Sequence, residues 1–339
     1  MKILFLSHNF YPFLGGIEVN SALLATSFAK AGHQVLLLTW TAEDGNKAFP
    51  FEVVRNPSLA QLFRAHLWTD MVFENNPCLR LSWLDFFTRR PLVVTLNTWI
   101  ARSSGRLGIQ DKLKFQWLKR ANSVVAVSEA VRKKCWPKAT VIGNPYRADE
   151  FERLSSIPKD RDFVFLGRLV SDKGVDLAIK AFYQLLSKEP KQNHSFTIVG
   201  DGPERKKLEH MVNKLGLNDH VHFTGALQGK VLVQCLNRHR FMLVPSMWEE
   251  PFGNVALEGI ACGCIPIVSD GGGLPDAVGN AGITFRRGNL SHLVDTIQKV
   301  LQQSSLEQQL REAAKAHLKK HHPEEVCRQY LNVIIASVK

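Results

Sequence analysis

Short apolar runs of strand length alternate with amphipathic stretches of helical spacing along the whole of this 339-residue chain. Ten runs have the composition of buried strands: 3–7, 35–39, 71–73, 93–96, 124–127, 163–166, 197–199, 222–224, 242–244 and 265–269. Strands that alternate with helices are typical of parallel sheets in α/β layers. Because the pattern repeats in the two halves, the sequence predicts two similar Rossmann-like domains.

The alternation lapses around residues 145–160 into a polar connector, and a fresh strand pattern follows it. A chain of this length is expected to form two domains, each with its own core. We therefore predict an N-terminal domain over 1–155 and a C-terminal domain over 156–315. A last helix within 316–339 follows the completed second pattern and could pack back on the first domain.

The composition, 45% hydrophobic and 22% charged residues, favours a soluble globular protein. No apolar run reaches the roughly 18 residues of a membrane span, and residues 1–8 are better interpreted as a strand than as a signal peptide. The six cysteines lack the spacing of a disulfide framework, which fits a reducing cytoplasm. Cys262-Gly-Cys264 has no companion ligand pair, so we interpret it as packing rather than as a metal site.

Two carboxylates, Glu250 and Glu258, flank a proline-aromatic-glycine step between two apolar strands. The segment is typical of a loop that runs into a helix. A helix N-terminus has unpaired N–H groups and a partial positive charge, which favour a phosphate. Glu258, about one turn into the helix, would point back toward the same ligand. This segment is the first candidate for a site.

Two further segments place suitable groups at strand ends. Arg168 follows one predicted strand and Lys173 immediately precedes a helix, so both cations are expected at the carboxyl edge of a parallel sheet, where open α/β sheets bind ligands. Gly15 and Gly16 stand at the turn after the first strand and would allow close backbone approach. The full Gly-x-Gly-x-x-Gly fingerprint of a dinucleotide site is absent there.

Five motifs then occur in a characteristic order: Gly-Gly-Ile-Glu after the first strand, Gly-Arg-Leu-Val-Ser-Asp-Lys-Gly, Val-Gly-Asp-Gly-Pro-Glu, Glu-Pro-Phe-Gly-Asn-Val-Ala-Leu-Glu and Ser-Asp-Gly-Gly-Gly-Leu-Pro-Asp. The chain resembles a retaining glycosyltransferase of family 4 (glycosyl transferases group 1). The resemblance covers nearly the whole chain and is strongest in its second half. It implies the GT-B fold, two Rossmann-like domains that face each other across a cleft.

The resemblance also implies roles. Glu250 would bind donor-sugar hydroxyls, Glu258 the ribose hydroxyls, and Arg168 with Lys173 the diphosphate. Backbone groups would complete the donor site: Gly15 and Gly16 in the first domain, Phe252, Gly253, Asn254 and Val255 at the helix start, and Ala226 and Leu227 near the base. The implied reaction moves a sugar from a UDP- or GDP-linked donor to a glycan or lipid-linked acceptor in cell-envelope polysaccharide or glycolipid synthesis.

The implied reaction needs no cofactor and no metal, because the cations and the helix start suit the charge that grows on the leaving phosphate. Asp160-Arg-Asp162 matches a metal-binding Asp-x-Asp only as a chance triplet in the connector. One position departs from the family. Asn97 stands where a histidine usually lines the catalytic centre, so either a neutral contact or a neighbour such as His8 serves there, or Asn97 is only a strand-end turn residue.

Positive charge concentrates in the first half. The formal net charge is +12, and residues 89–138 contain twelve Lys/Arg against Asp111 and Glu129. Within this region, residues 109–120 interleave apolar side chains with basic ones: Ile109, Leu113, Phe115, Trp117 and Leu118 with Lys112, Lys114, Lys119 and Arg120. Such a helix would lie on an anionic membrane surface or turn its apolar side to the core, and the two readings weigh equally. We expect a cytoplasmic enzyme, peripheral on the inner face of the membrane, with a lipid-linked or polyanionic acceptor.

Two alternatives were compared with this function. A nucleotide-sugar 2-epimerase of the same fold would bind the same donor, but the two-glutamate motif argues against it. A basic nucleic-acid-binding protein would fit the pI near 9.5, but no recognisable binding module accompanies the basic residues. The sequence therefore favours a transferase that has no nucleic-acid partner.

Overall fold

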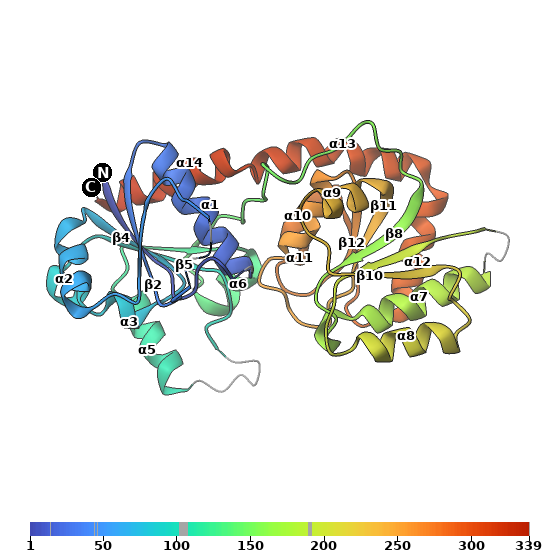
Figure 1. The fold of residues 1–339 in the computed structure, drawn as a ribbon, viewed down its shortest axis with the longest axis horizontal. Coiled ribbons are helices and arrows are strands. Elements are labelled where there is room, and N and C mark those ends of the chain that lie inside the picture. The colour runs from blue at the N-terminus through green and yellow to red at the C-terminus, as the bar shows by residue number, and fades with distance from the viewer. Residues whose placement is uncertain (14, 44, 46, 102–107, 189–191, 339) are drawn as a thin grey trace. The chain divides into compact units, whose positions relative to one another are not determined.

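The computed structural model describes residues 1–13, 15–43, 45, 47–101, 108–188 and 192–338. The chain divides into two compact units, Met1–Pro145 with His321–Lys339, and Tyr146–Lys320 (Figure 1). The division falls ten residues earlier than the boundary we predicted at 155/156, because Tyr146 onward belongs with the second unit. The returning segment begins at His321 rather than at 316.

The first unit is built on a seven-stranded parallel sheet in the order β3-β2-β1-β4-β5-β6-β7. Its strands are β1 (Lys2–Leu6), β2 (Gln34–Thr39), β3 (Glu52–Arg55), β4 (Met71–Asn75), β5 (Leu92–Leu96), β6 (Ser123–Ala126) and β7 (Thr140–Val141). Its helices are α1 (Gly16–Lys30), α2 (Leu59–Trp68), α3 (Leu79–Ser82), α4 (Asp85–Thr88), α5 (Ile109–Leu118), α6 (Glu129–Cys135) and α14 (Pro323–Val338).

The core of the first unit explains why α14 returns to it. The central strands β4 and β5 are buried along their whole length, as expected of a sheet covered on both faces. Phe73 stacks edge-on against Phe28 of α1 and against the fully buried Tyr330 of α14. Helix α14 packs on α1, β5 and β6. The last helix therefore completes one face of the first sheet.

The second unit has a six-stranded parallel sheet in the order β10-β9-β8-β11-β12-β13. Its strands are β8 (Arg161–Leu166), β9 (Phe196–Val199), β10 (Val221–Gly225), β11 (His239–Val244), β12 (Ile265–Ser269) and β13 (Ile283–Phe285). Its helices are η1 (Ser171–Lys173), α7 (Val175–Lys188), α8 (Arg205–Lys214), α9 (Gly229–Arg238), α10 (Asn254–Ala261), α11 (Leu274–Val278), η2 (Gly279–Ala281), α12 (Leu290–Gln302) and α13 (Ser304–Lys320).

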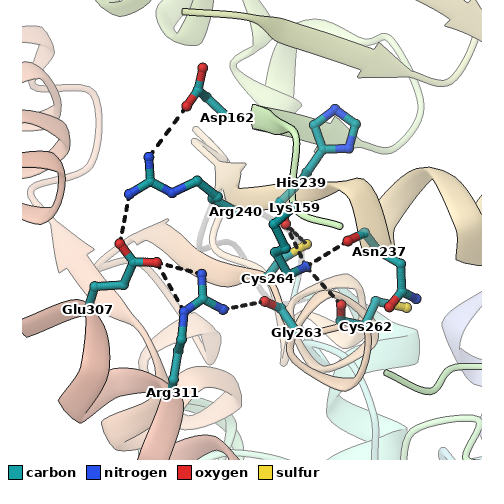
Figure 2. Close-up of polar contacts among 10 residues, drawn as sticks. All are labelled: Lys159, Asp162, Asn237, His239, Arg240, Cys262, Gly263, Cys264, Glu307 and Arg311. Carbon is teal, nitrogen blue, oxygen red and sulfur yellow. Dashed lines mark hydrogen bonds and ion pairs between the residues drawn. The ribbon is translucent and has the colours of Figure 1, made fainter. Parts of the chain in front are cut away.

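A polar cluster fixes the amino edge of the second sheet (Figure 2). The ammonium group of Lys159 donates to the backbone carbonyls of Asn237, His239 and Cys262 at 3.1, 2.7 and 3.0 Å. Glu307 of α13 accepts from Arg240 at 2.8 Å and from Arg311. The thiol of Cys264 is buried and donates to the Leu236 carbonyl at 3.1 Å. This cluster lies at the edge opposite the carboxyl ends of the strands.

The two units, each with a parallel sheet, confirm the two Rossmann-like domains that the sequence predicted. In the described part of the chain, no helix is both long enough and apolar enough to cross a membrane.

Candidate functional site

The turn after β8 carries Arg168 at the carboxyl edge of the second sheet. Gly200, at φ +142, lies so close that a Cβ there would be 1.8 Å from the Gly167 carbonyl oxygen, and a Cβ on Gly202 would be 2.4 Å from the Leu169 oxygen. The Gly200-Asp-Gly202 turn is therefore a structural support for the Arg168 turn. The Arg168 side chain is exposed, and no carboxylate from the described residues pairs with it.

The next turn positions Lys173. Gly174 adopts φ +68, and a Cβ there would be 2.1 Å from the Pro245 carbonyl oxygen, so only glycine fits. The Asp172 carbonyl accepts from the backbone N–H groups of Met247 and Trp248 at 2.8 and 3.1 Å. These bonds attach η1 to the loop after β11. Lys173 consequently lies beside the residues that follow that strand.

Glu250 lies beside Lys173. Its Oε1 accepts from the Lys173 ammonium and, at 2.9 Å, from the Ser246 hydroxyl. The Glu250 carbonyl accepts from Gly273 N at 2.7 Å, which fixes its backbone against the loop after β12. Within the described part of the chain, Oε2 of Glu250 receives no donor. The carboxylate is thus held by one oxygen and keeps the other available.

Helix α10 begins where the sequence predicted a helix start. Gly253 is its N-cap at φ +112, and a Cβ there would be 2.4 Å from Leu274 Cδ2. Phe252 is buried, while Gly253, Asn254 and Val255 are partly exposed. The helix has no acidic residue in its first turn. Its N–H groups and partial positive charge therefore suit an anion.

Glu258 has a partner that the sequence did not reveal. Arg147, at the beginning of the second unit, donates through Nε and Nη2 to Glu258 Oε1 at 3.2 and 2.9 Å. Nη1 of Arg147 pairs with Glu150 at 2.6 Å. Burial raises the pKa of the Glu258 carboxyl, and the Arg147 charge opposes that shift. As with Glu250, the second oxygen of Glu258 has no donor from the described residues.

Ala226 and Leu227 follow β10 at the same sheet edge, exposed and partly exposed respectively. The structure thus brings Arg168, Lys173, Glu250, Glu258, the start of α10 and these two residues to the carboxyl ends of neighbouring or nearby strands. Arg147 and Ser246 are additional residues of the site. Ser246 gave no signal because a serine after a strand is common.

In the first unit, Gly15 is the N-cap of α1 and Gly16 its first residue, and both are exposed. Glu18 lies in the first turn, and its carboxylate is so near that a Cβ on Gly15 would come within 2.2 Å of Oε2. That negative charge disfavours an anion at this helix start unless Glu18 moves away.

Asn97 lies inside a polar network at the carboxyl end of β5. Its Nδ2 donates to Asn75 Oδ1 at 2.6 Å, and its Oδ1 accepts from Asn20 Nδ2 at 2.7 Å. Asn20 also donates to Asn144 at 3.3 Å, and the backbone N–H of Asn97 donates to Asn76. Asn97 is only 7% exposed. The structure therefore gives Asn97 a more buried and more constrained position than that of an isolated turn residue.

A group of cations lies at the same edge of the first sheet. Arg80 stacks over the Trp40 ring at 4.8 Å. Burial, reinforced by the nearby charges of Arg80 and Lys114, lowers the pKa of His8. In the described residues neither Arg80 nor Lys114 pairs with a carboxylate. His8 is accordingly neutral near pH 7, beside two charges that are not compensated.

The comparison with known proteins follows this geometry. Residues 147–317, half of the chain, match the family described as Glycosyl transferases group 1. The gpi3 subunit of phosphatidylinositol N-acetylglucosaminyltransferase from Schizosaccharomyces pombe is 30% identical over 208 residues, 58% of this chain and 44% of that protein. The 2-deoxystreptamine glucosyltransferase of Streptomyces kanamyceticus is 29% identical over 63% of this chain and 55% of that protein. The chain thus spans about half the length of these two relatives.

Solved structures agree on the fold. The structure of Anabaena HepE in complex with UDP covers 99% of this chain and 100% of its own, at a TM-score of 0.82 and 21% identity. The structure of sucrose-phosphate synthase from Thermosynechococcus elongatus covers 99% of this chain and 98% of its own, at a TM-score of 0.79 and 19% identity. The residues matched by the family, 147–317, include the Arg168 and Lys173 turns, both glutamates and the start of α10. The chain therefore belongs to the glycosyl transferases group 1 family.

Proposed function

We propose that the protein transfers a sugar from a nucleotide-sugar donor, UDP- or GDP-linked, to a glycan or lipid-linked acceptor in cell-envelope polysaccharide or glycolipid synthesis. The observation that carries the proposal is the arrangement of the two glutamates. Each accepts a cation on one carboxylate oxygen, Glu250 from Lys173 and Glu258 from Arg147, and leaves the other oxygen without a donor from the described residues. Two fixed carboxylates with an open oxygen each suit the hydroxyl groups of a sugar and of a ribose.

The phosphate part of the donor fits the groups between them. Arg168 has no carboxylate partner in the described residues, Lys173 lies beside Glu250, and α10 begins close by in the chain. A diphosphate carries charge that these groups would offset, and hydrogen bonds to charged groups are stronger than neutral ones. UDP bound in the HepE structure is consistent with a nucleoside diphosphate in this fold.

We propose retention of anomeric configuration without a metal ion. As the bond from the anomeric carbon to the phosphate oxygen breaks, negative charge grows on the leaving diphosphate. Arg168, Lys173 and the N–H groups at the start of α10 would stabilise that charge. A phosphate oxygen of the donor would take the acceptor's proton on the face that the diphosphate leaves. Glu250 would then orient the sugar rather than attack it, because Lys173 and Ser246 hold its carboxylate.

For the acceptor, the first unit supplies the distinguishing feature. Arg80 and Lys114 are cations without carboxylate partners in the described residues, near the neutral His8 and at the carboxyl edge of the sheet. They favour an acceptor that carries a negative group, such as the phosphate of a lipid-linked glycan. We propose that Asn97 takes part through a neutral hydrogen bond, or orients the network around it, at the position where the family resemblance implies a histidine.

A thermal-shift panel of nucleoside diphosphates and nucleotide sugars tests the donor part. A ligand at about 100 times its dissociation constant should add about 2.7 kcal/mol to the free energy of unfolding. We expect one nucleotide to stabilise the protein without added metal, and slow donor hydrolysis that Glu250→Ala abolishes. If no nucleotide stabilises the protein, the proposal is wrong.

A further inference from the structure

Exposed apolar side chains of the first unit gather on one side of its sheet. Helices α2, α3 and α5 lie on the side of the sheet opposite α1 and α14 (Figure 1). Of fourteen large hydrophobic side chains that are exposed in the described part of the chain, eight belong to this side. We call them the α2–α5 face: Leu59, Phe63, Leu67, Trp83, Phe86, Phe87, Ile109 and Leu113.

The helical elements of this face, α2, the α3–α4 segment and α5, are joined directly. His66 Nε2 of α2 lies 2.9 Å from the Leu81 carbonyl oxygen of α3, and α2 packs on α4. Phe86 of α4 stacks edge-on against the buried Trp117 of α5, with ring centroids 5.0 Å apart. The exposed side chains thus belong to one contiguous surface rather than to separate loops.

Their exposure follows from helix geometry. Leu59, Phe63 and Leu67 are four residues apart and share one face of α2, while Leu62, Ala65 and His66 turn toward the core. The most exposed members come from three elements: Leu59 at 73%, Phe87 at 76% and Ile109 at 80%. Contiguous exposed apolar surface on a folded unit marks a docking site.

The charges around the face indicate what docks there. Five exposed cations accompany it, none paired with a carboxylate in the described residues: Arg64, Arg80, Arg89, Lys112 and Lys119. Most carboxylates of the same segment are buried and add no negative charge to this surface. Glu74, Asp85 and Asp111 are buried, and among the described residues from α2 to α5 only Asp70 has an exposed carboxylate.

This combination distinguishes among partners. A second copy of the chain would bring two positively charged faces together. A nucleic acid would match the charge but leave the apolar side chains facing its phosphates. An anionic bilayer accepts both, because apolar side chains enter the acyl boundary and cations remain at the headgroups. We infer that the α2–α5 face is a docking surface for an anionic lipid bilayer.

The inference rests on the lipid-linked acceptor proposed above and assigns its surface. The structure also shows how α5 divides between the two readings given to residues 109–120, a membrane-facing helix and a core-facing one. Trp117 and Leu118 of α5 are buried in the core, and Ile109 and Leu113 form the exposed side instead. Most of the docking surface comes from α2 and the α3–α4 segment.

Vesicle flotation of the full chain tests the inference without donor or acceptor. The vesicles contain phosphatidylcholine alone or equal parts of phosphatidylcholine and phosphatidylglycerol. The test variant combines Leu59→Ser, Phe87→Ser and Ile109→Ser, one exposed residue from each element. The matched control combines Tyr183→Ser and Val231→Ser, exposed apolar residues of the second unit. A charge variant, Arg89→Glu with Lys112→Glu, has Lys206→Glu with Lys214→Glu as its control.

We expect wild type and both controls to float with anionic vesicles, more strongly at low salt than at physiological salt. The triple serine variant should lose at least about tenfold in partition coefficient, because each apolar side chain buried contributes free energy. The charge variant should lose binding to anionic vesicles only. Equal melting temperatures would show that the variants fold.

Three results would overturn the inference: no binding of wild type to anionic vesicles at low salt, binding by the triple variant equal to wild type, or a dimer in light scattering that the triple variant dissolves. Nucleotide stabilisation is measured separately on the same preparations. If the wild type binds nucleotide but no anionic vesicles, only the docking surface is refuted. If the wild type binds anionic vesicles but no nucleotide stabilises it, only the proposed donor site is refuted.

Discussion

Substitution of Glu250 by glutamine would separate the two functions proposed for the Lys173–Glu250 pair, diphosphate binding and sugar binding. In the structure the Lys173 ammonium is bound to Glu250 Oε1. If Lys173 binds the donor diphosphate, it must be shared with Glu250 or released from it. Glu250→Gln removes the negative charge but keeps an oxygen that can accept from Ser246. The variant therefore frees Lys173 without deleting the side chain.

The magnitude follows from the burial of the pair. The two side chains are 29% and 13% exposed, between a surface pair and a buried one. Exposed pairs are worth up to about 1 kcal/mol, while at an effective dielectric of 20 the Coulomb energy at 4 Å is about 4 kcal/mol before desolvation is subtracted. A net value of about 1 kcal/mol predicts that a nucleoside diphosphate binds Glu250→Gln about fivefold more tightly.

The Glu250→Gln substitution should weaken binding of the nucleotide sugar relative to binding of the diphosphate. It gains the same freed Lys173 but loses a hydrogen bond between a sugar hydroxyl and a charged carboxylate, worth about 1.5–3 kcal/mol. The ratio of the two dissociation constants, nucleotide sugar over diphosphate, should therefore rise about ten- to a hundredfold. Because the Lys173 effect is common to both ligands, this ratio isolates the sugar contact.

Isothermal titration with UDP, GDP and their sugar conjugates measures the ratio. Glu249→Gln is the matched control, since Glu249 is adjacent and pairs with Arg287 at 3.2 Å; it should leave the ratio unchanged. Lys173→Met should weaken both ligands by a similar factor. If Glu250→Gln weakens diphosphate and nucleotide sugar equally, Glu250 is not a sugar contact and the reasoning fails.

Three further predictions follow from the structure. Glu258→Gln should weaken nucleoside diphosphates by about ten- to a hundredfold, the loss of one hydrogen bond to a charged group, and leave inorganic diphosphate unaffected in the same titration; equal losses would show that Glu258 does not contact the ribose. Gly253→Ala should lower thermal stability by roughly 1–3 kcal/mol, because φ is +112 and Leu274 blocks a Cβ; an unchanged melting temperature would contradict that constraint. Burial raises the pKa of Glu74 from 4.5 to about 7. Between these pH values the folded protein keeps the proton that the unfolded chain releases. The free energy of unfolding of the first unit should therefore fall by up to about 3 kcal/mol as the pH rises from 4.5 to about 7. Glu74→Gln should flatten that slope in hydrogen exchange of the first unit, and a persistent slope would assign it to another group.

The central strands could be predicted from the sequence because their side chains are buried on both faces. Runs such as 93–96 lie within β5, where every residue is buried. The edge strands β3, β7 and β13 were missed for the opposite reason. Glu52–Arg55 is exposed or partly exposed and begins and ends with charges, and β7 has only two residues. Apolar composition identifies a strand most readily where both faces are covered; the exposed edge strand β10, which run 222–224 did predict, is an exception.

The candidate site was predicted where its residues are close in the chain. Glu250 and Glu258 share one segment, and Arg168 and Lys173 share another, so local motifs carry them. Arg147 was missed because 111 residues separate it from Glu258. The sequence identified Asn97 as a candidate residue but did not predict its hydrogen-bond network, because its partners Asn75 and Asn20 come from other elements. Polar residues buried by tertiary contacts leave no periodic signal.

Charge balance connects these observations to the way a donor would enter. In the structure Lys173 is paired with Glu250, and Arg147 is shared by Glu258 and Glu150. Among the cations identified at the site, Arg168 has no carboxylate partner in the described residues. A diphosphate would then meet Arg168 first and gain Lys173 only as Glu250 turns to the sugar. A bare phosphate would bind weakly, because it gives Glu250 no hydroxyl in exchange for Lys173. A nucleotide sugar supplies that hydroxyl and would therefore bind more tightly. Selectivity for a nucleotide sugar would then come from the ion pair as much as from the shape of the site.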